Sequence, residues 1–194
     1  MAQVLTSLDA AVLKKNHCYF GGGTAIALRY GEFRESVDID LLVSDLAGYS
    51  ALRQRLTGNA GIAAIAAPGA TLKALREIRA DQYGIRTALA VGEATIKFEI
   101  VLEARIALEA PGPRDQIAGI ATLTALDLMS SKLLANSDRW ADDAVFSRDL
   151  IDLAMMDKPK LLPAAIAKAS AAYGASIQRD LAQAITRLRE REGW

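Results

Sequence analysis

The chain has little of the chemistry that many enzymes use, with one cysteine, Cys18, and one histidine, His17, among 194 residues. A single cysteine excludes an intrachain disulfide framework, and one cysteine with one histidine excludes a Cys/His zinc cluster. A Ser-His-Asp triad would have to be built on His17. We therefore expect any catalytic site to consist of carboxylates, lysines, arginines and backbone amides.

Net charge and long apolar runs are also lacking. The 23 Lys and Arg residues balance 23 Asp and Glu residues, and the pI is near 6.6. This balance excludes a polycationic nucleic-acid coat, so a nucleic-acid surface would have to be a local patch. No apolar run approaches the roughly 20 residues that cross a bilayer, and no signal-peptide pattern is present. We expect a cytoplasmic protein with no membrane partner.

Alanine is abundant, with 37 residues, and it favours helices while adding little apolar area. Residues 1–15 fit an amphipathic helix. Over residues 37–41, Val37, Ile39 and Leu41 alternate with two aspartates, which predicts a strand with both carboxylates on one face. Residues 85–91 and 94–102 predict a β-hairpin.

The second part of the chain shows helical periodicity without strand patterns. Helices are expected over residues 123–138, 142–157, 162–173 and 176–191. The predicted fold class is α+β, with an α/β core of mixed sheet and helices over residues 1–121 and a helical domain over residues 122–194.

Two short motifs point to phosphate chemistry. Gly22, Gly23 and Thr24 follow an apolar run and open a helix, where glycines permit close backbone approach and free N–H groups attract an anion. Asp38 and Asp40 place two like charges side by side, which favours a counter-cation such as Mg²⁺. Such a metal site would support nucleotidyl transfer.

Together these motifs resemble the nucleotidyltransferase superfamily related to DNA polymerase β. More narrowly, residues 21–29 (GGGTAIALR) and 34–41 (RESVDIDL) resemble the AbiEii/AbiGii toxin family. The resemblance implies a polymerase-β-like core, an NTP held by Gly22, Gly23 and Thr24 with Arg34 or Ser36 nearby, and Mg²⁺ held by Asp38 and Asp40.

A second block is similar to the same family, with KLLANSDR over residues 132–139 and SRDLIDL over residues 147–153. Helical spacing places Lys132 and Arg139 on one face, and Asp149 and Asp152 on one face of the next helix. We expect Lys132 and Arg139 to bind phosphates, and Asp149 to orient Lys132 or help deprotonate the acceptor. An interhelical salt-bridge network is the structural alternative.

The superfamily usually has a third metal-binding carboxylate on a later strand. Glu99 is the candidate, and Glu103 on the same face is the second choice. The toxin-family resemblance further implies an RNA acceptor such as the tRNA 3′ end and a cognate antitoxin. Alternatives are transfer to a small molecule or to a protein hydroxyl, and a catalytically silent module that binds a partner.

Overall fold

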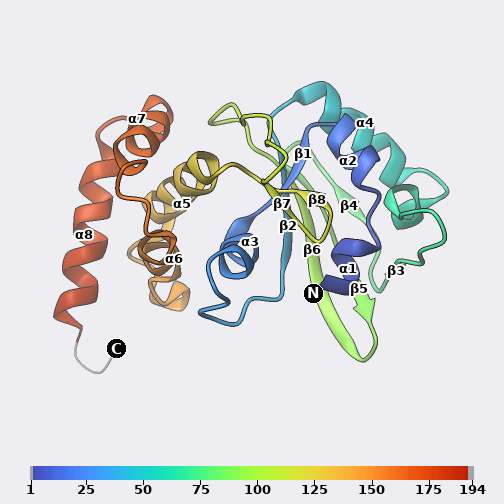
Figure 1. Cartoon of the computed structure of the whole chain (residues 1–194), viewed down its shortest axis with the longest axis horizontal. Coiled ribbons are helices and arrows are strands. Elements are labelled where there is room, and N and C mark those ends of the chain that lie inside the picture. Colours follow the sequence, from blue (N-terminus) through green and yellow to red (C-terminus); the bar gives the residue numbers. More distant parts are fainter. Residues whose placement is uncertain (1, 192–194) are drawn as a thin grey trace.

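The computed structural model of the chain describes residues 2–191 (Figure 1). Met1, which begins the predicted N-terminal helix, and residues 192–194, which end the predicted helical domain, lie outside the described residues.

The main sheet has six strands of mixed direction. Its order is β1 (Cys18–Gly21), β2 (Ile39–Val43), β6 (Ala94–Leu102), β5 (Gly84–Val91) and β3 (Lys73–Ala74), and β4 (Arg79–Ala80) also pairs with β5. Strands β2 and β6 are parallel, and the other pairs are antiparallel. Strands β7 (Gln116–Ile117) and β8 (Ile120–Ala121) form a separate small hairpin. The β5–β6 hairpin confirms the expectation from the sequence.

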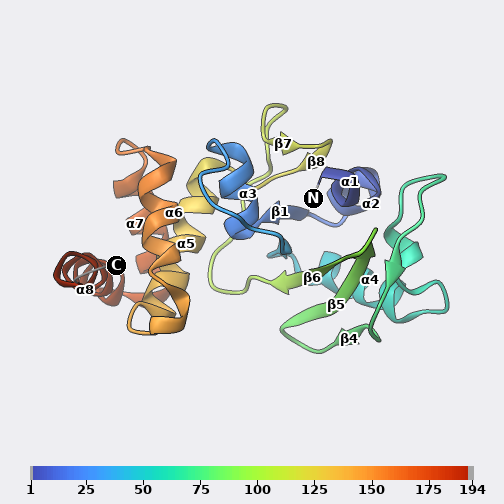
Figure 2. The same cartoon turned by 90° about the horizontal axis from the view of Figure 1, so that it is seen from below.

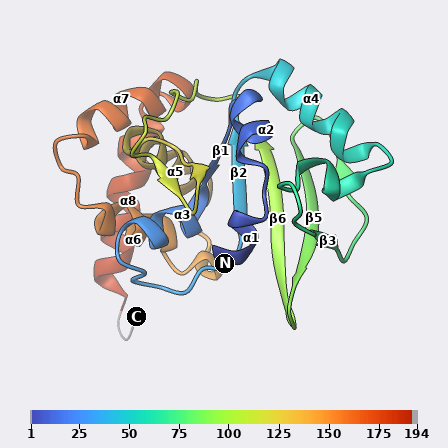
Figure 3. The ribbon, with the colours of Figure 1, turned by 45° about the vertical axis from the view of Figure 1, so that its right-hand side comes forward.

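Helices cover the sheet from two sides (Figures 1 and 3). On one side lie α1 (Ala2–Thr6), α2 (Ala10–Lys15), α4 (Leu46–Thr57) and the short 3₁₀ helix Gly61–Ile65. On the other side lie α3 (Gly22–Arg29) and the C-terminal helices α5 (Ala125–Arg139), α6 (Arg148–Met156), α7 (Leu162–Tyr173) and α8 (Ser176–Glu190). The predicted α+β class, with a mixed sheet followed by a helical bundle, is confirmed.

Alternation along β2 and β6 divides the sheet into an apolar and a polar face. Ile39 and Leu41 of β2 pair with Phe98 and Ile100 of β6, and all four are essentially excluded from solvent. The same buried cluster continues into the C-terminal helices through residues such as Leu133. The core therefore continues across the predicted boundary between residues 121 and 122.

The opposite face of these strands carries the polar side chains. Asp40 of β2 stands beside Glu99 of β6 in the parallel register. Helix α3 covers this face near β1 and β2, whereas the β5–β6 end extends beyond the C-terminal helices (Figure 2).

Three local predictions were wrong. Strand β2 begins at Ile39, so Val37, which was expected to share its buried face, lies before it and is 50% exposed. The predicted helix over residues 1–15 is two helices, because the Asp9 side chain caps a new start by accepting from the N–H groups of Ala11 and Val12. The predicted helix over residues 142–157 is interrupted by left-handed Phe146 and Ser147.

Candidate active site

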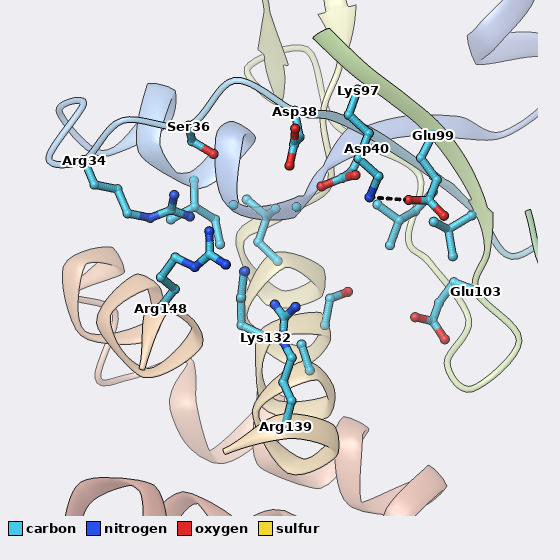
Figure 4. Close-up of a pocket in the computed structure, with 18 of the residues that line it drawn as sticks. Arg34, Ser36, Asp38, Asp40, Lys97, Glu99, Glu103, Lys132, Arg139 and Arg148 are labelled. Carbon is cyan, nitrogen blue, oxygen red and sulfur yellow. Dashed lines mark ion pairs between the residues drawn. The ribbon is translucent and has the colours of Figure 1, made fainter. Parts of the chain in front are cut away.

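One cavity, of about 330 Å³, brings the two sequence motifs together (Figure 4). Its sheet wall carries the carboxylates of Asp38 and Asp40, and its helical wall carries Lys132 and Arg139 of α5. The cavity is also lined by Gly22 and Gly23, Arg34 and Ser36, Lys97, Glu99 and Glu103, Arg105 and Arg148.

The glycine turn is required by close packing at the entry to α3. Gly22 has a φ of +68°, and a Cβ at this position would overlap the Asp40 carboxylate. A Cβ at Gly23 would overlap the Arg34 guanidinium and lie 3.2 Å from Asp152 Oδ2. Both glycines therefore let charged side chains approach the start of α3, whose first amides carry partial positive charge.

Asp40 lies in β2 and Asp38 directly precedes the strand, and both carboxylates are directed into the cavity (Figure 4). Burial is the largest cause that raises the pKa of Asp40, and the neighbouring carboxylates of Glu99 and Asp38 raise it further, whereas Lys97 and Lys132 lower it. A group whose ionisation is hindered in this way is a suitable place for a cation to bind. The oxygen donors of this pair fit Mg²⁺, with the remaining ligands supplied by phosphate and water.

Glu99, the predicted third metal ligand, has both carboxylate oxygens in ion pairs. Arg86 Nε lies 2.6 Å from Oε1, and Lys97 Nζ lies 2.8 Å from Oε2. Burial alone would raise the pKa of Glu99, but these two cations outweigh it and lower the pKa. The second choice, Glu103, is buried and pairs with Arg105 at 2.7 Å. Among residues 2–191 no three acidic, His or Cys side chains form a group that could hold a metal. A third ligand stays a prediction.

The helical wall is built on two buried carboxylates. Lys132 Nζ lies 2.9 Å from Asp149 and 2.8 Å from Asp152, and Arg139 Nε lies 2.7 Å from Asp149. Arg34 donates from Nε and Nη2 to the two oxygens of Asp152, at 2.7 and 2.9 Å. We call these five residues the α5–α6 charge network.

The charge network holds Asp149 ionised. Burial would raise the pKa of Asp149, but hydrogen bonds and charges from Arg139 and Lys132 outweigh burial and lower it. Asp149 and Asp152 do not line the cavity, and their cationic partners do. Asp149 can therefore orient Lys132 and Arg139, whereas its location does not favour direct contact with an acceptor hydroxyl.

Two hydroxyls, one on α3 and one in the segment that precedes β2, form a hydrogen-bonded pair. Thr24 Oγ1 and Ser36 Oγ are 2.7 Å apart. Ser36 lines the cavity, whereas Thr24 is 1% exposed and does not line it. Thr24 can act on a ligand through Ser36, which differs from the direct contact expected from the sequence.

Sequence reasoning missed three cavity cations, Lys97, Arg105 and Arg148. Lys97 lies two residues before Glu99 in β6, so strand periodicity places both side chains on the same polar face. The position of Lys97 beside the cavity could therefore have been inferred from the sequence. Arg148 also lines the cavity, and its Nε donates to the Val145 carbonyl at 3.0 Å. No local sequence pattern predicts this placement.

Carboxylates at the sheet edge of the cavity thus face the basic side chains of Lys132 and Arg139, and Gly22 and Gly23 line the same cavity. This arrangement fits a nucleoside triphosphate with a divalent cation, as in nucleotidyltransferases. The sequence profile of the family described as "Nucleotidyl transferase AbiEii toxin, Type IV TA system" matches residues 3–193. The chain belongs to this nucleotidyltransferase family, so the prediction from the sequence is confirmed.

Solved structures of similar proteins come from Helicobacter pylori. JHP933 is 16% identical with a TM-score of 0.49, over 96% of this chain and 92% of that one. A proposed nucleotidyltransferase from the same organism is 15% identical with a TM-score of 0.39, over 95% of this chain and 94% of that one. Similarity at this level carries no functional argument. No curated protein matches the chain significantly.

Family membership establishes the general activity. The chain is a nucleotidyltransferase of a type IV toxin–antitoxin family, which implies an NTP substrate and an antitoxin partner. Within residues 2–191, no helix is long and apolar enough to cross a membrane.

Proposed function

We propose that this nucleotidyltransferase uses Mg²⁺ and transfers an NMP from an NTP to RNA, most specifically to the 3′ end of tRNA. Such a modification would block translation until the cognate antitoxin acts. Since NTPs and tRNA are cytoplasmic, the cytoplasm is the proposed place of action.

The observation that carries the proposal is the polarity of the cavity, with Asp38 and Asp40 opposite Lys132 and Arg139 (Figure 4). A triphosphate carries negative charge that the basic wall can neutralise, and a carboxylate pair can hold the cation that accompanies it. A simple apolar ligand would use neither wall.

Each residue has a defined part in this proposal. Phosphate oxygens are bound by Lys132, Arg139 and Arg34. The backbone amides of Gly22 and Gly23, at the start of α3, also bind phosphate. Ser36 contacts the nucleotide and Thr24 positions Ser36. Asp149 is a positioning residue for Lys132 and Arg139.

Asp38 and Asp40 are the proposed Mg²⁺ ligands. Glu99 could join them only by releasing an oxygen from Lys97 or Arg86. When bound, Mg²⁺ supplies neutralisation of phosphate charge and a lower pKa for the acceptor hydroxyl.

The reaction forms one bond and breaks one. The acceptor oxygen attacks the α-phosphorus, the bond from the α-phosphorus to the bridging oxygen breaks, and pyrophosphate leaves. The hydroxyl proton passes to water. The protein's contribution is to hold both reactants in line and to stabilise charge on the phosphates.

The test is transfer of label from each of the four α-labelled NTPs to total tRNA in the presence of Mg²⁺. We expect labelled tRNA with at least one NTP, and loss of labelling on addition of EDTA. Asp38→Ala should lower transfer by at least about a hundredfold. Glu93→Gln, on the exposed turn between β5 and β6, is the matched control and should retain transfer.

No RNA labelling with any NTP would overturn the RNA proposal. Labelling of added small molecules or of protein instead would identify those acceptors. In cells, toxicity that survives Asp38→Ala would show that the chain acts by binding a partner rather than by transfer.

A further inference from the structure

We propose that a groove beside the cavity binds the single-stranded 3′ end of the RNA acceptor, through phosphate contacts with Arg76 and Arg79. The groove, of about 800 Å³, lies over β4, β5 and β6. This inference rests on the proposed function, because it names where the acceptor of that reaction lies.

The groove and the cavity are neighbours. Asp38 and Lys97 line both, so the groove opens at the carboxylate side of the cavity. In Figure 4 these two residues lie across the cavity from Lys132 and Arg139. The side of the cavity that the groove joins is therefore opposite the proposed phosphate-binding wall.

This placement suits in-line transfer. The attacking hydroxyl must approach the α-phosphorus from the side opposite the leaving pyrophosphate. If Lys132 and Arg139 bind the leaving phosphates, the acceptor arrives from the side of Asp38 and Lys97. A strand lying in the groove would deliver its terminal hydroxyl to that point.

The charge of the groove favours a polyanion. It is lined by four cations, Arg76, Arg79, Arg86 and Lys97, and by two carboxylates, Asp38 and Glu77. Arg86 and Lys97 are held by Glu99, with Arg86 also bound to Asp81. Arg76 and Arg79 are exposed, and among residues 2–191 their side chains form no hydrogen bond or ion pair.

Unpaired arginines are suited to phosphodiester groups, which they bind with two parallel hydrogen bonds. Two such cations beside Thr95, on an open strand surface, match a chain of repeating phosphates better than a small molecule buried in a closed pocket. The groove has no large apolar or aromatic side chain among its lining residues, which disfavours a protein partner.

The experiment compares charge reversal in the groove with charge reversal elsewhere. Arg76→Glu with Arg79→Glu is the test pair, and Arg53→Glu with Arg55→Glu on the exposed surface of α4 is the control pair. The probe is a short single-stranded RNA with a 5′ fluorophore and a free 3′ hydroxyl. Anisotropy titrations over a range of salt concentrations give its Kd, and a fluorescent NTP reports the nucleotide site.

The test pair should weaken RNA binding by about tenfold or more. It should also reduce the slope of log K against log salt by about 1.4, because two phosphate contacts to a single strand are lost. NTP affinity and the thermal midpoint should stay at the wild-type values. The control pair should leave all of these readouts unchanged.

Equal RNA affinity and salt slope in the test and control pairs would reject the groove as an RNA-binding site. This holds equally for an empty groove and for a groove that binds a protein. Transfer to tRNA that is unimpaired in the test pair would also overturn it, while leaving the proposed function intact. Conversely, groove-dependent RNA binding without any transfer would support the groove and reject the proposed function.

Discussion

At the scale of single residues, Asp152 is the carboxylate on which two parts of the site depend. It is fully buried, accepts hydrogen bonds from Arg34, which precedes β2, and forms an ion pair with Lys132 on α5. Three cations share two carboxylates in the charge network, so the wall keeps a positive charge while no buried carboxylate lacks a partner. The network can be stable before a nucleotide arrives.

Asp152→Asn should therefore lower the free energy of unfolding by about 3 kcal/mol, because Arg34 and Lys132 lose a buried counter-charge. Asp143→Asn is the matched control, since Asp143 also pairs with two arginines, Arg187 and Arg191, but is 63% exposed. The loss at this exposed position should be much smaller, because solvent screens a surface ion pair. Denaturant unfolding measures both, and equal losses would contradict a structural role for the buried position.

Gly22→Ala tests the packing of the glycine turn against Asp40. Its φ of +68° alone would cost an alanine about 1 kcal/mol. Overlap with the Asp40 carboxylate should add to this cost and should abolish transfer. Gly69→Ala separates the two effects, because Gly69 has a φ of +78° and open space around the position. It should show the backbone cost in denaturant unfolding and full activity in the transfer assay.

At the scale of elements, the interface between α5 and α6 is held by ionised Asp149. Because its pKa is lowered in the folded protein, its contribution to stability is fully present above the unfolded-state pKa of about 3.9. The contribution disappears as the pH falls through the folded-state pKa. The free energy of unfolding should thus decrease as the pH drops below about 4.

Asp149→Asn should be less stable than wild type at pH 7 and should lose less stability on acidification. Glu93→Gln should follow the wild-type acid dependence. Denaturant unfolding from pH 7 to pH 3 makes the comparison, and parallel curves for wild type and Asp149→Asn would reject the assigned cause.

The elements show what the sequence could and could not predict. The β5–β6 hairpin and the four C-terminal helices were accessible because alternation and helical periodicity are local signals. The break at Asp9 was also accessible, as a capping residue within a helical pattern. The turn at Phe146 and Ser147 was not, because neither residue type marks a left-handed conformation.

The candidate site divides in the same way. The sequence predicted that Asp149 orients Lys132, and the structure pairs Asp149 with both Lys132 and Arg139. The bond between Arg34 and Asp152 joins residues 118 positions apart, and only the packing of α3 on α6 brings them together. Sequence spacing also could not reveal that Lys97 and Arg86 form ion pairs with both carboxylate oxygens of Glu99.

At the scale of the whole molecule, the sheet and the C-terminal helices share one core. Buried residues of α3, such as Ile26, belong to the same cluster as Leu133 of α5 and Leu153 of α6. Arg105 adds a polar connection, since it binds Glu103 after β6 and Asp138 on α5. The boundary predicted at residues 121 and 122 therefore crosses a continuous interior.

Residues 1–121 alone should not fold cooperatively, because removal of the helices exposes the apolar side of α3, which packs on α5 and α6. Circular dichroism of this fragment should show a broad, non-cooperative thermal change, with the full chain as the cooperative control. A sharp transition in the fragment would instead support two independent domains.

The single thiol of Cys18 lies on β1 in the middle of this interior, fully buried, and burial raises its pKa above the usual value for cysteine. A thiol reagent cannot reach it while β1 remains in the sheet. The rate at which an unmodified molecule becomes labelled would then measure how often the native sheet opens. Labelling of the native Cys18 by a thiol reagent would thus report opening of the sheet without an introduced residue.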